Sequence, residues 1–221
     1  MTKYHVSRVM LGICLAVGFL ADANAARSAD AGSFCKHAVS TAFDLSGSDA
    51  FLSRENSATT VFRGHTAFFY AAITGRLDNV RTWLGFPENK KLVDSELVFA
   101  AIQNEALGTI RLLLQEGINI ALTDERGTTV TTVAAQCGNA VILAELIKAR
   151  VASFEPNYDG VDPMIAAIMA DCLPCVELLL DSGYDVEQRR TKNGKSLRDL
   201  ALAKGNLAIS SRIERAGRTV P

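Results

Sequence analysis

Apolar positions in residues 64–217 recur as a repeated unit and not as one continuous pattern. Each unit has a short alanine-rich stretch, then a small or polar turn residue, then a second stretch with paired large aliphatic residues. The turn residues are spaced at intervals of 30, 33, 33 and 34 and are Gly75, Glu105, Gly138, Asp171 and Gly205. A period near 33 with two short helices predicts a stacked helical solenoid, because one such unit cannot bury a core alone.

The residue types within each unit fit this prediction. Alanine pairs allow the first helices of adjacent units to approach closely, and leucine pairs on the second helices supply apolar surface for stacking. Each fully buried leucine contributes about 1.5–3 kcal/mol. Left-handed backbone at helix ends is expected at Gly117, Gly183 and Gly217, and tight hairpin turns are expected at Gly127, Gly160 and Gly194.

From Gly64 onward the units resemble ankyrin repeats in residue type and position. The first unit reads Gly64-His65-Thr66-Ala67, continues to Ala71-Ala72, and has glycine at the turn. The resemblance implies an all-α ankyrin-repeat solenoid of helix-turn-helix units joined by short hairpins, in the secreted bacterial type. The repeat region is expected to be 63–221, with units at about 64–94, 95–123, 124–156, 157–190 and 191–217.

Departures from the family pattern predict local irregularity. The family's histidine in the Thr-Pro-Leu-His stretch is replaced by Phe69, Thr132 and Ile165. We therefore expect packing to replace the hydrogen bonds that this histidine makes between units. Arg150 stands where the third unit should have glycine. The second unit lacks its hairpin glycine, so the first junction is expected to be irregular.

The N-terminal region has the organisation of an export signal. Residues 1–25 combine Lys3 and Arg8 with an apolar run at 9–20 and an Ala-x-Ala site that ends at Ala25. The run is shorter than the roughly 20 residues that span a bilayer, so we expect cleavage, no membrane span afterwards, and a periplasmic or secreted protein. Residues 26–62 are expected to form a leader and a helical N-terminal cap.

The composition of the chain argues against nucleic acid, metal ions and cofactors as ligands. The chain has 23 basic and 24 acidic residues, so no strongly basic field exists to bind nucleic acid. Its three histidines share no spacing typical of metal ligands. No catalytic motif is evident in the sequence, and we expect neither an enzyme nor a bound cofactor.

The one motif with reactive potential is Cys172-Leu173-Pro174-Cys175. We expect Asp171 to cap a helix whose first turn holds both cysteines, within reach of a disulfide. A structural disulfide is the favoured interpretation. A thiol–disulfide redox protein that uses Cys172 and Cys175 is the alternative, and a haem or metal carrier is disfavoured because Val176 follows where a histidine would be needed. The spacing leaves the states of Cys35 and Cys137 open.

The resemblance implies a partner-binding surface made of hairpin tips and the exposed positions of the first helices. Transferred by position, its candidate residues are Arg63, His65, Arg126, Tyr158, Asp159, Met169, Lys192 and Asn193. We expect a non-catalytic protein–protein interaction module that is a monomer when free. Proteins of the secreted bacterial type support oxidative-stress enzymes or neutralise toxins, and the resemblance does not choose between these roles.

Overall fold

A computed structural model describes residues 61–62, 65–87 and 89–218, and within them it has ten α-helices arranged as five hairpins. The first helix of each pair is an inner helix: α4 (Ala67–Ile73), α6 (Ser95–Gln103), α8 (Val130–Gln136), α10 (Pro163–Met169) and α12 (Leu197–Ala203). The second is an outer helix: α5 (Leu77–Leu84), α7 (Leu107–Gln115), α9 (Ala140–Lys148), α11 (Leu173–Asp181) and α13 (Leu207–Gly217). The expected ankyrin-repeat solenoid is confirmed.

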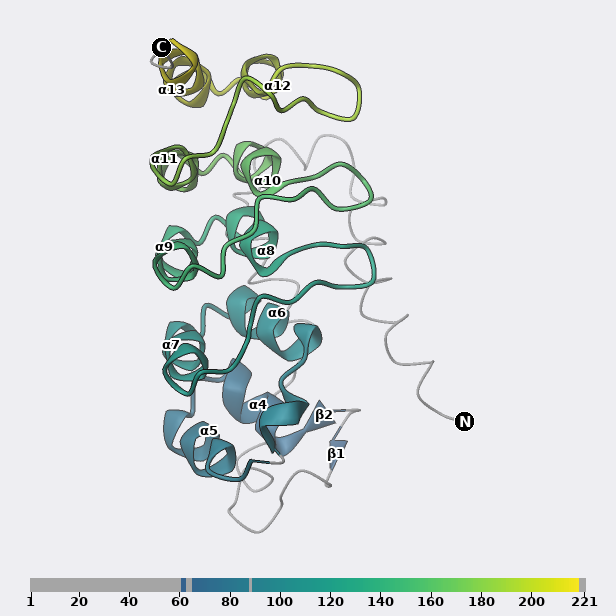
Figure 1. The fold of residues 1–221 in the computed structure, drawn as a ribbon, viewed down its shortest axis with the longest axis vertical. Helices are drawn as coiled ribbons and strands as arrows, with labels where there is room; N and C mark the ends of the chain where they lie inside the picture. Colours follow the sequence, from purple (N-terminus) through teal and green to yellow (C-terminus); the bar gives the residue numbers. More distant parts are fainter. Residues whose placement is uncertain (1–60, 63–64, 88, 219–221) are drawn as a thin grey trace.

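The helices stack in two columns. Figure 1 shows the outer helices above one another on one side and the inner helices beside them, with the connecting hairpins projecting on the far side of the inner column. Neighbouring units contact each other inner helix to inner helix and outer helix to outer helix. Each unit therefore obtains its core from the units on either side, as the repeat period predicts.

The N-terminal predictions fall mostly outside the described residues. The signal at 1–25 and the leader and cap at 26–60 lie there. The expectation of a cap extending to residue 62 is wrong for its last two residues. Strand β1 (Val61–Phe62) pairs antiparallel with strand β2 (His65–Thr66), so these residues form the hairpin of the first unit.

The first junction is irregular, as the sequence suggested. A 3-10 helix, η2 (Asn89–Leu92), lies where the other units have a projecting hairpin. The buried Asn89 side chain donates to the carbonyl oxygen of Trp83 at 2.9 Å. This bond fastens the segment to the end of α5.

The turn between the two helices has a left-handed residue in all five units. The φ angles are 69° at Gly75, 57° at Glu105, 65° at Gly138, 56° at Asp171 and 78° at Gly205. Arg150 also has a positive φ, 59°, at the end of α9. The backbone thus requires this conformation even where the chain provides a residue with a side chain, which costs roughly 1–2 kcal/mol.

The prediction of a left-handed residue is wrong at Gly217, which is the last residue of α13. A Cβ atom at this position would overlap the carboxylate of Glu187. The glycine therefore makes room for a neighbouring segment instead of ending the helix through its φ angle. The predictions at Gly117 and Gly183, with φ angles of 67° and 91°, are confirmed.

The core follows the alanine and leucine positions of the repeat. The paired alanines of the inner helices are buried between neighbouring helices. On the outer helices, the first member of each aliphatic pair is fully buried, as at Leu113, Leu146 and Leu179. The second member is only partly buried against this core.

Hydrogen bonds, as well as packing, tie the units together. The hydroxyl of Thr109, in α7, donates to the carbonyl oxygen of Ala72 in the first unit at 2.7 Å. The backbone N–H of Ser153 donates to the Thr131 hydroxyl at 3.0 Å. The expectation that packing alone would replace the missing histidines is therefore wrong, because buried threonines at other positions supply the bonds.

A buried tie joins the start of α10, in the fourth unit, to the segment that leads from α11 to the fifth unit. The buried Tyr184 hydroxyl donates to Asp162 Oδ2 at 2.5 Å, while Asp162 Oδ1 accepts from the N–H of Ile165 and caps α10. Phe154 packs edge-on against the Tyr184 ring at 5.6 Å between centroids. Burial, followed by the bond to Asp162, raises the pKa of Tyr184 well above its usual value.

Candidate protein-binding surface

The hairpin tips of the third, fourth and fifth units form a connected strip. Arg126, on the third tip, pairs with Asp159 on the fourth, and its carbonyl oxygen accepts from the N–H of Tyr158 at 2.9 Å. A Cβ atom at Gly160 would lie 3.4 Å from the Cβ of Lys192 on the fifth tip. Each tip therefore rests on the preceding one, and the strip is ordered before any partner arrives.

Tyr158 is the most prominent side chain of this strip. Its side chain is 80% exposed, yet its ring carbons would lie 3.6 Å from a Cβ placed at Gly127. The ring therefore lies over the backbone of the third tip and presents its other side to solvent. Tyrosines that are held in place while exposed are frequent energetic centres of protein interfaces.

Local hydrogen bonds explain why the tips hold their shape. In the third hairpin, Asp124 Oδ1 accepts from the N–H groups of Arg126 and Thr128 at 2.9 and 2.7 Å. In the fourth, Asn157 Oδ1 accepts from Asp159 and Val161 at 3.1 and 2.9 Å. The same side-chain-to-backbone turn thus builds both hairpins.

The inner helices α8 and α10 follow the hairpins of this strip in the chain, and each ends in an exposed residue. Met169, the last residue of α10, is 50% exposed, and the equivalent position in α8 is the exposed Gln136. Buried residues precede both. An exposed methionine offers a flexible apolar contact that adapts to different partners.

The remaining predicted binding residues fall in three groups. Lys192 and Asn193 are exposed on the fifth tip. His65 is in strand β2, and Arg63 lies outside the described residues. Arg126 and Asp159 are brought together by an ion pair that was not predicted from the sequence, although their separation of one repeat length was a signal for it.

The cysteine motif lies on the other helix of the fourth unit. Cys172 and Cys175 are joined in a disulfide, with 5.3 Å between their Cα atoms. The N-cap of α11 is Cys172, whose sulfur accepts from the N–H of Cys175 at 3.2 Å. The expectation that Asp171 caps this helix is wrong, because Asp171 is the left-handed turn residue before it.

Both sulfur atoms of the motif are shielded. Cys172 is 8% exposed and Cys175 is fully buried, so an attacking thiolate has little access to either. Cys137, at the C-cap of α8, is also disulfide-bonded. The sequence left open whether Cys137 is a free thiol. The structure shows that it is not.

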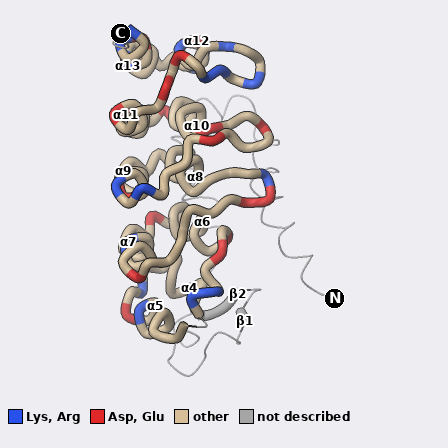
Figure 2. Tube along the Cα trace, viewed as in Figure 1, with Lys and Arg blue, Asp and Glu red and all other residues tan. Residues whose placement is uncertain are grey.

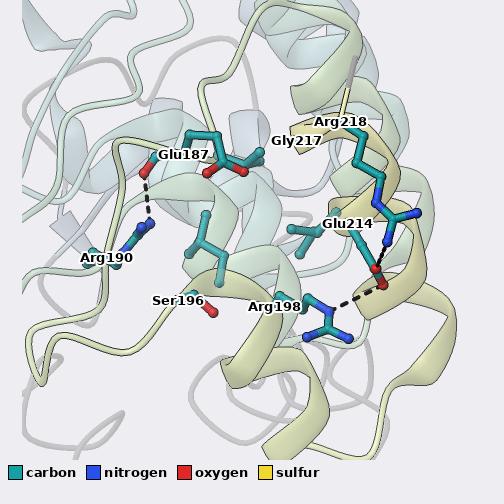
Figure 3. Close-up of a pocket in the computed structure, with 10 residues that line it drawn as sticks. Glu187, Arg190, Ser196, Arg198, Glu214, Gly217 and Arg218 are labelled. Carbon is teal, nitrogen blue, oxygen red and sulfur yellow. Dashed lines mark hydrogen bonds and ion pairs between the residues drawn. The ribbon is translucent and has the colours of Figure 1, made fainter. Parts of the chain in front are cut away.

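A shallow pocket lies at the C-terminal end, between the fifth hairpin and the two helices that follow it (Figure 3). Its volume is about 290 Å³. Its cations are already engaged: Arg198 and Arg218 both pair with Glu214, and Arg190 donates to two backbone carbonyls. Among the described residues that line the pocket, no cation is therefore free to hold an anionic ligand.

Within the described part of the chain, no three His, Cys, Asp or Glu side chains are grouped in a way that could hold a metal ion. In those same residues, none of the helices is both long and apolar enough to cross a bilayer.

Comparison with protein families supports the repeat assignment. A family model described as "Ankyrin repeats (3 copies)" matches residues 97–190, which includes three of the inner–outer pairs seen here. Residues 97–190 carry ankyrin repeats. The matched range includes the third and fourth hairpins and ends in the fifth, so the tip strip belongs mostly to the matched part.

Similar proteins match part of this chain. The chain is 33% identical over 97 residues to nuclear factor NF-kappa-B p105 subunit of Mus musculus, and the match covers 42% of this chain and 10% of that protein. It is 30% identical over 122 residues to the Gallus gallus p105 subunit, and this match covers 54% of this chain and 12% of that protein. The match thus spans about a tenth of each relative, and the relatives' activities do not carry over with it.

Proposed function

We propose that the chain is a non-catalytic protein-binding module whose binding surface is made of the tips of hairpins three to five and the exposed ends of the inner helices that follow the third and fourth hairpins. The observation that carries this proposal is the preordered strip in which Arg126 pairs with Asp159 and Tyr158 stays exposed. A surface that is already fixed loses little conformational freedom on binding. Ankyrin repeats generally serve such interactions, which supports the assignment.

We further propose that the protein acts in the periplasm or outside the cell, as a monomer when free. The export signal expected at residues 1–25 supports the location. The partner is either an enzyme that acts under oxidative stress or a toxin, and its identity decides between these two roles.

A redox role for Cys172 and Cys175 is not supported. The burial of both sulfurs fits a structural disulfide at the start of α11. Alkylation of the reduced protein across pH would test this. A Cys172 pKa near 8.5 or above fits a structural pair, and a value well below it would reinstate the redox alternative.

The binding proposal is tested by capture of partners from periplasmic extract with the full chain. We expect a stoichiometric partner whose recovery falls when Tyr158→Ala is combined with Arg126→Ala. A matched control combines Val141→Ala with Arg215→Ala, which removes an exposed apolar residue and an exposed arginine from the outer helices. Equal loss in both variants, or no partner under several growth conditions, would contradict the proposal.

A further inference from the structure

The charge of this chain changes sign along the array, although the whole sequence is nearly neutral. Residues 94–183, from the N-cap of α6 to the turn after α11, contain the second to fourth helix pairs and hold thirteen acidic and four basic residues, a net charge of −9. Residues 184–218, the fifth unit, hold nine basic and four acidic residues, a net charge of +5. Figure 2 shows the basic residues gathered on the last hairpin and acidic ones along the two hairpins before it.

Within the second to fourth units, the negative charge lies away from the outer helices. The outer helices and their ends, residues 107–117, 140–150 and 173–183, have four acidic and three basic residues. The rest, residues 94–106, 118–139 and 151–172, forms the hairpins, the inner helices and the turns after them, and we call it the inner face. It holds nine acidic residues and one basic residue, Arg126.

Three of the four outer carboxylates are paired with cations across units, whereas the inner face has a single cation of its own. On the outer side, Glu116 pairs with Lys90, Glu145 with Arg111 and Asp181 with Arg212, each across units. On the inner face, Arg126 is the one cation and is already paired with Asp159.

Some inner-face acids do serve the fold. Asp94 and Asp162 cap inner helices, and Asp124 holds the third hairpin. Glu125 is exposed on the third hairpin, and Glu155, which is also exposed, is ion-paired with Arg189 at 3.7 Å. Partial burial and the neighbouring Asp94 raise the pKa of Glu96.

An excess of like charge reduces the stability of a compact fold, so nine acidic residues against one basic residue on this face call for a role outside folding. We propose that the partner places a lysine- and arginine-rich protein segment on the inner face of the second to fourth units. This inference rests on the binding function proposed above and specifies the chemistry of its partner.

The exposed apolar residues of the same face fit this partner. Tyr158 and Met169 are 80% and 50% exposed and lie in the fourth unit, next to the basic fifth unit. A tyrosine ring attracts a lysine or arginine head group, and a methionine packs against the aliphatic stem of such a side chain.

The basic fifth unit gives the complex a direction. A basic segment is attracted by the inner face and repelled by the hairpin that carries Arg190, Lys192 and Lys195. The segment therefore runs over units two to four and leaves the array before unit five. Complementary charges of this kind raise association rates and exclude wrong partners.

The test uses two labelled twelve-residue peptides, one alternating lysine with serine and one alternating glutamate with serine, titrated into the full chain at 20 and 200 mM salt. We expect the lysine peptide to bind more tightly than the glutamate peptide and to weaken in high salt. Glu125→Gln with Glu155→Gln should weaken it about threefold to tenfold. The control, Glu177→Gln with Asp181→Asn, removes the same charge from the outer helix α11 and should change binding less than twofold.

Equal or tighter binding of the glutamate peptide, equal effects of the two double variants, or no binding of either peptide would overturn the inference. Capturing the natural partner with the same variants separates this failure from failure of the proposed function. If a partner is recovered that depends on Tyr158 but not on Glu125 and Glu155, the binding function stands and the basic segment is wrong.

Discussion

The fourth and fifth units have the same backbone but differ in what lies against them. Ile168 of α10 is fully buried by the following unit, while Leu202, at the equivalent position of α12, is 40% exposed because no described unit follows it. The fourth unit is acidic on its hairpin side and the fifth is basic. The position of a unit in the array therefore decides whether an aliphatic residue is buried in the core or exposed to solvent. The charge of its hairpin decides whether the unit attracts or repels a charged partner.

The largest expected difference between the two units concerns their leucines. Leu179→Ala in the fourth unit removes a fully buried side chain and should lower the free energy of unfolding by about 2–5 kcal/mol. Leu207→Ala, at a 68% exposed position of the fifth, should change it by less than about 0.5 kcal/mol. Urea unfolding followed by circular dichroism measures both. Similar losses would mean that the fifth unit is covered by something outside the described residues.

The tie between the two units is the next target. Tyr184→Phe removes the hydroxyl that donates to Oδ2 of the buried Asp162 and should lower the free energy of unfolding by about 1–3 kcal/mol. Tyr158→Phe, on the exposed tip, is the control and should have no effect.

The same bond gives a pH dependence. The pKa of Tyr184 is higher in the folded protein than in the unfolded chain, where it is about 10. The stability that the protonated Tyr184 contributes is therefore fully present below about pH 10 and is lost as the pH rises above that value. Tyr184→Phe should make stability fall less steeply above pH 10 in urea unfolding across alkaline pH. An unchanged alkaline slope would contradict the assignment.

The starts of the outer helices offer a smaller contrast. In the fifth unit, Asn206 caps α13 by accepting from the N–H of Ile209, at the positions that hold Cys172 and Cys175 in the fourth. Cys172→Asn with Cys175→Ile would replace the disulfide by this cap. The free energy of unfolding should fall by about 1 kcal/mol, because the new cap offsets only part of the stability lost with the cross-link. Loss of partner binding at retained stability would reveal a role for the disulfide beyond structure.

Arg150 allows the cost of a left-handed backbone at the end of an outer helix to be measured. Its φ of 59° is unfavourable for a residue with a side chain, and Gly183 occupies the equivalent place in the fourth unit. Arg150→Gly should raise the free energy of unfolding by about 0.5–1 kcal/mol, and Gly183→Ala should lower it by a similar amount. Thermal unfolding of both variants measures the pair. A loss of stability in Arg150→Gly would show that the arginine side chain has a contact of its own.

Much of the fold follows from the sequence because the period fixes it. The five turn residues were located correctly even where they are Glu105 and Asp171, since the repeat spacing identified them and not their type. Gly217 was misjudged because its role depends on Glu187, a residue about thirty positions earlier whose side chain no local pattern locates.

The candidate site was less accessible to sequence reasoning. Tyr158 could be chosen as a tip residue, but its support by Gly127 and the Arg126–Asp159 pair depend on how closely adjacent tips approach. The whole-chain charge also concealed the site, because the opposite charges of the fourth and fifth units cancel. The acidic inner face becomes visible in the sequence only when charges are counted by unit and by face.

Hydrogen–deuterium exchange on the full chain with and without its captured partner tests the central claim most directly. The account predicts slower exchange on binding in the third and fourth hairpins, near residues 123–129 and 156–161, and at the ends of α8 and α10. Protection confined to the outer helices α7, α9 and α11, with the hairpins unchanged, would contradict it.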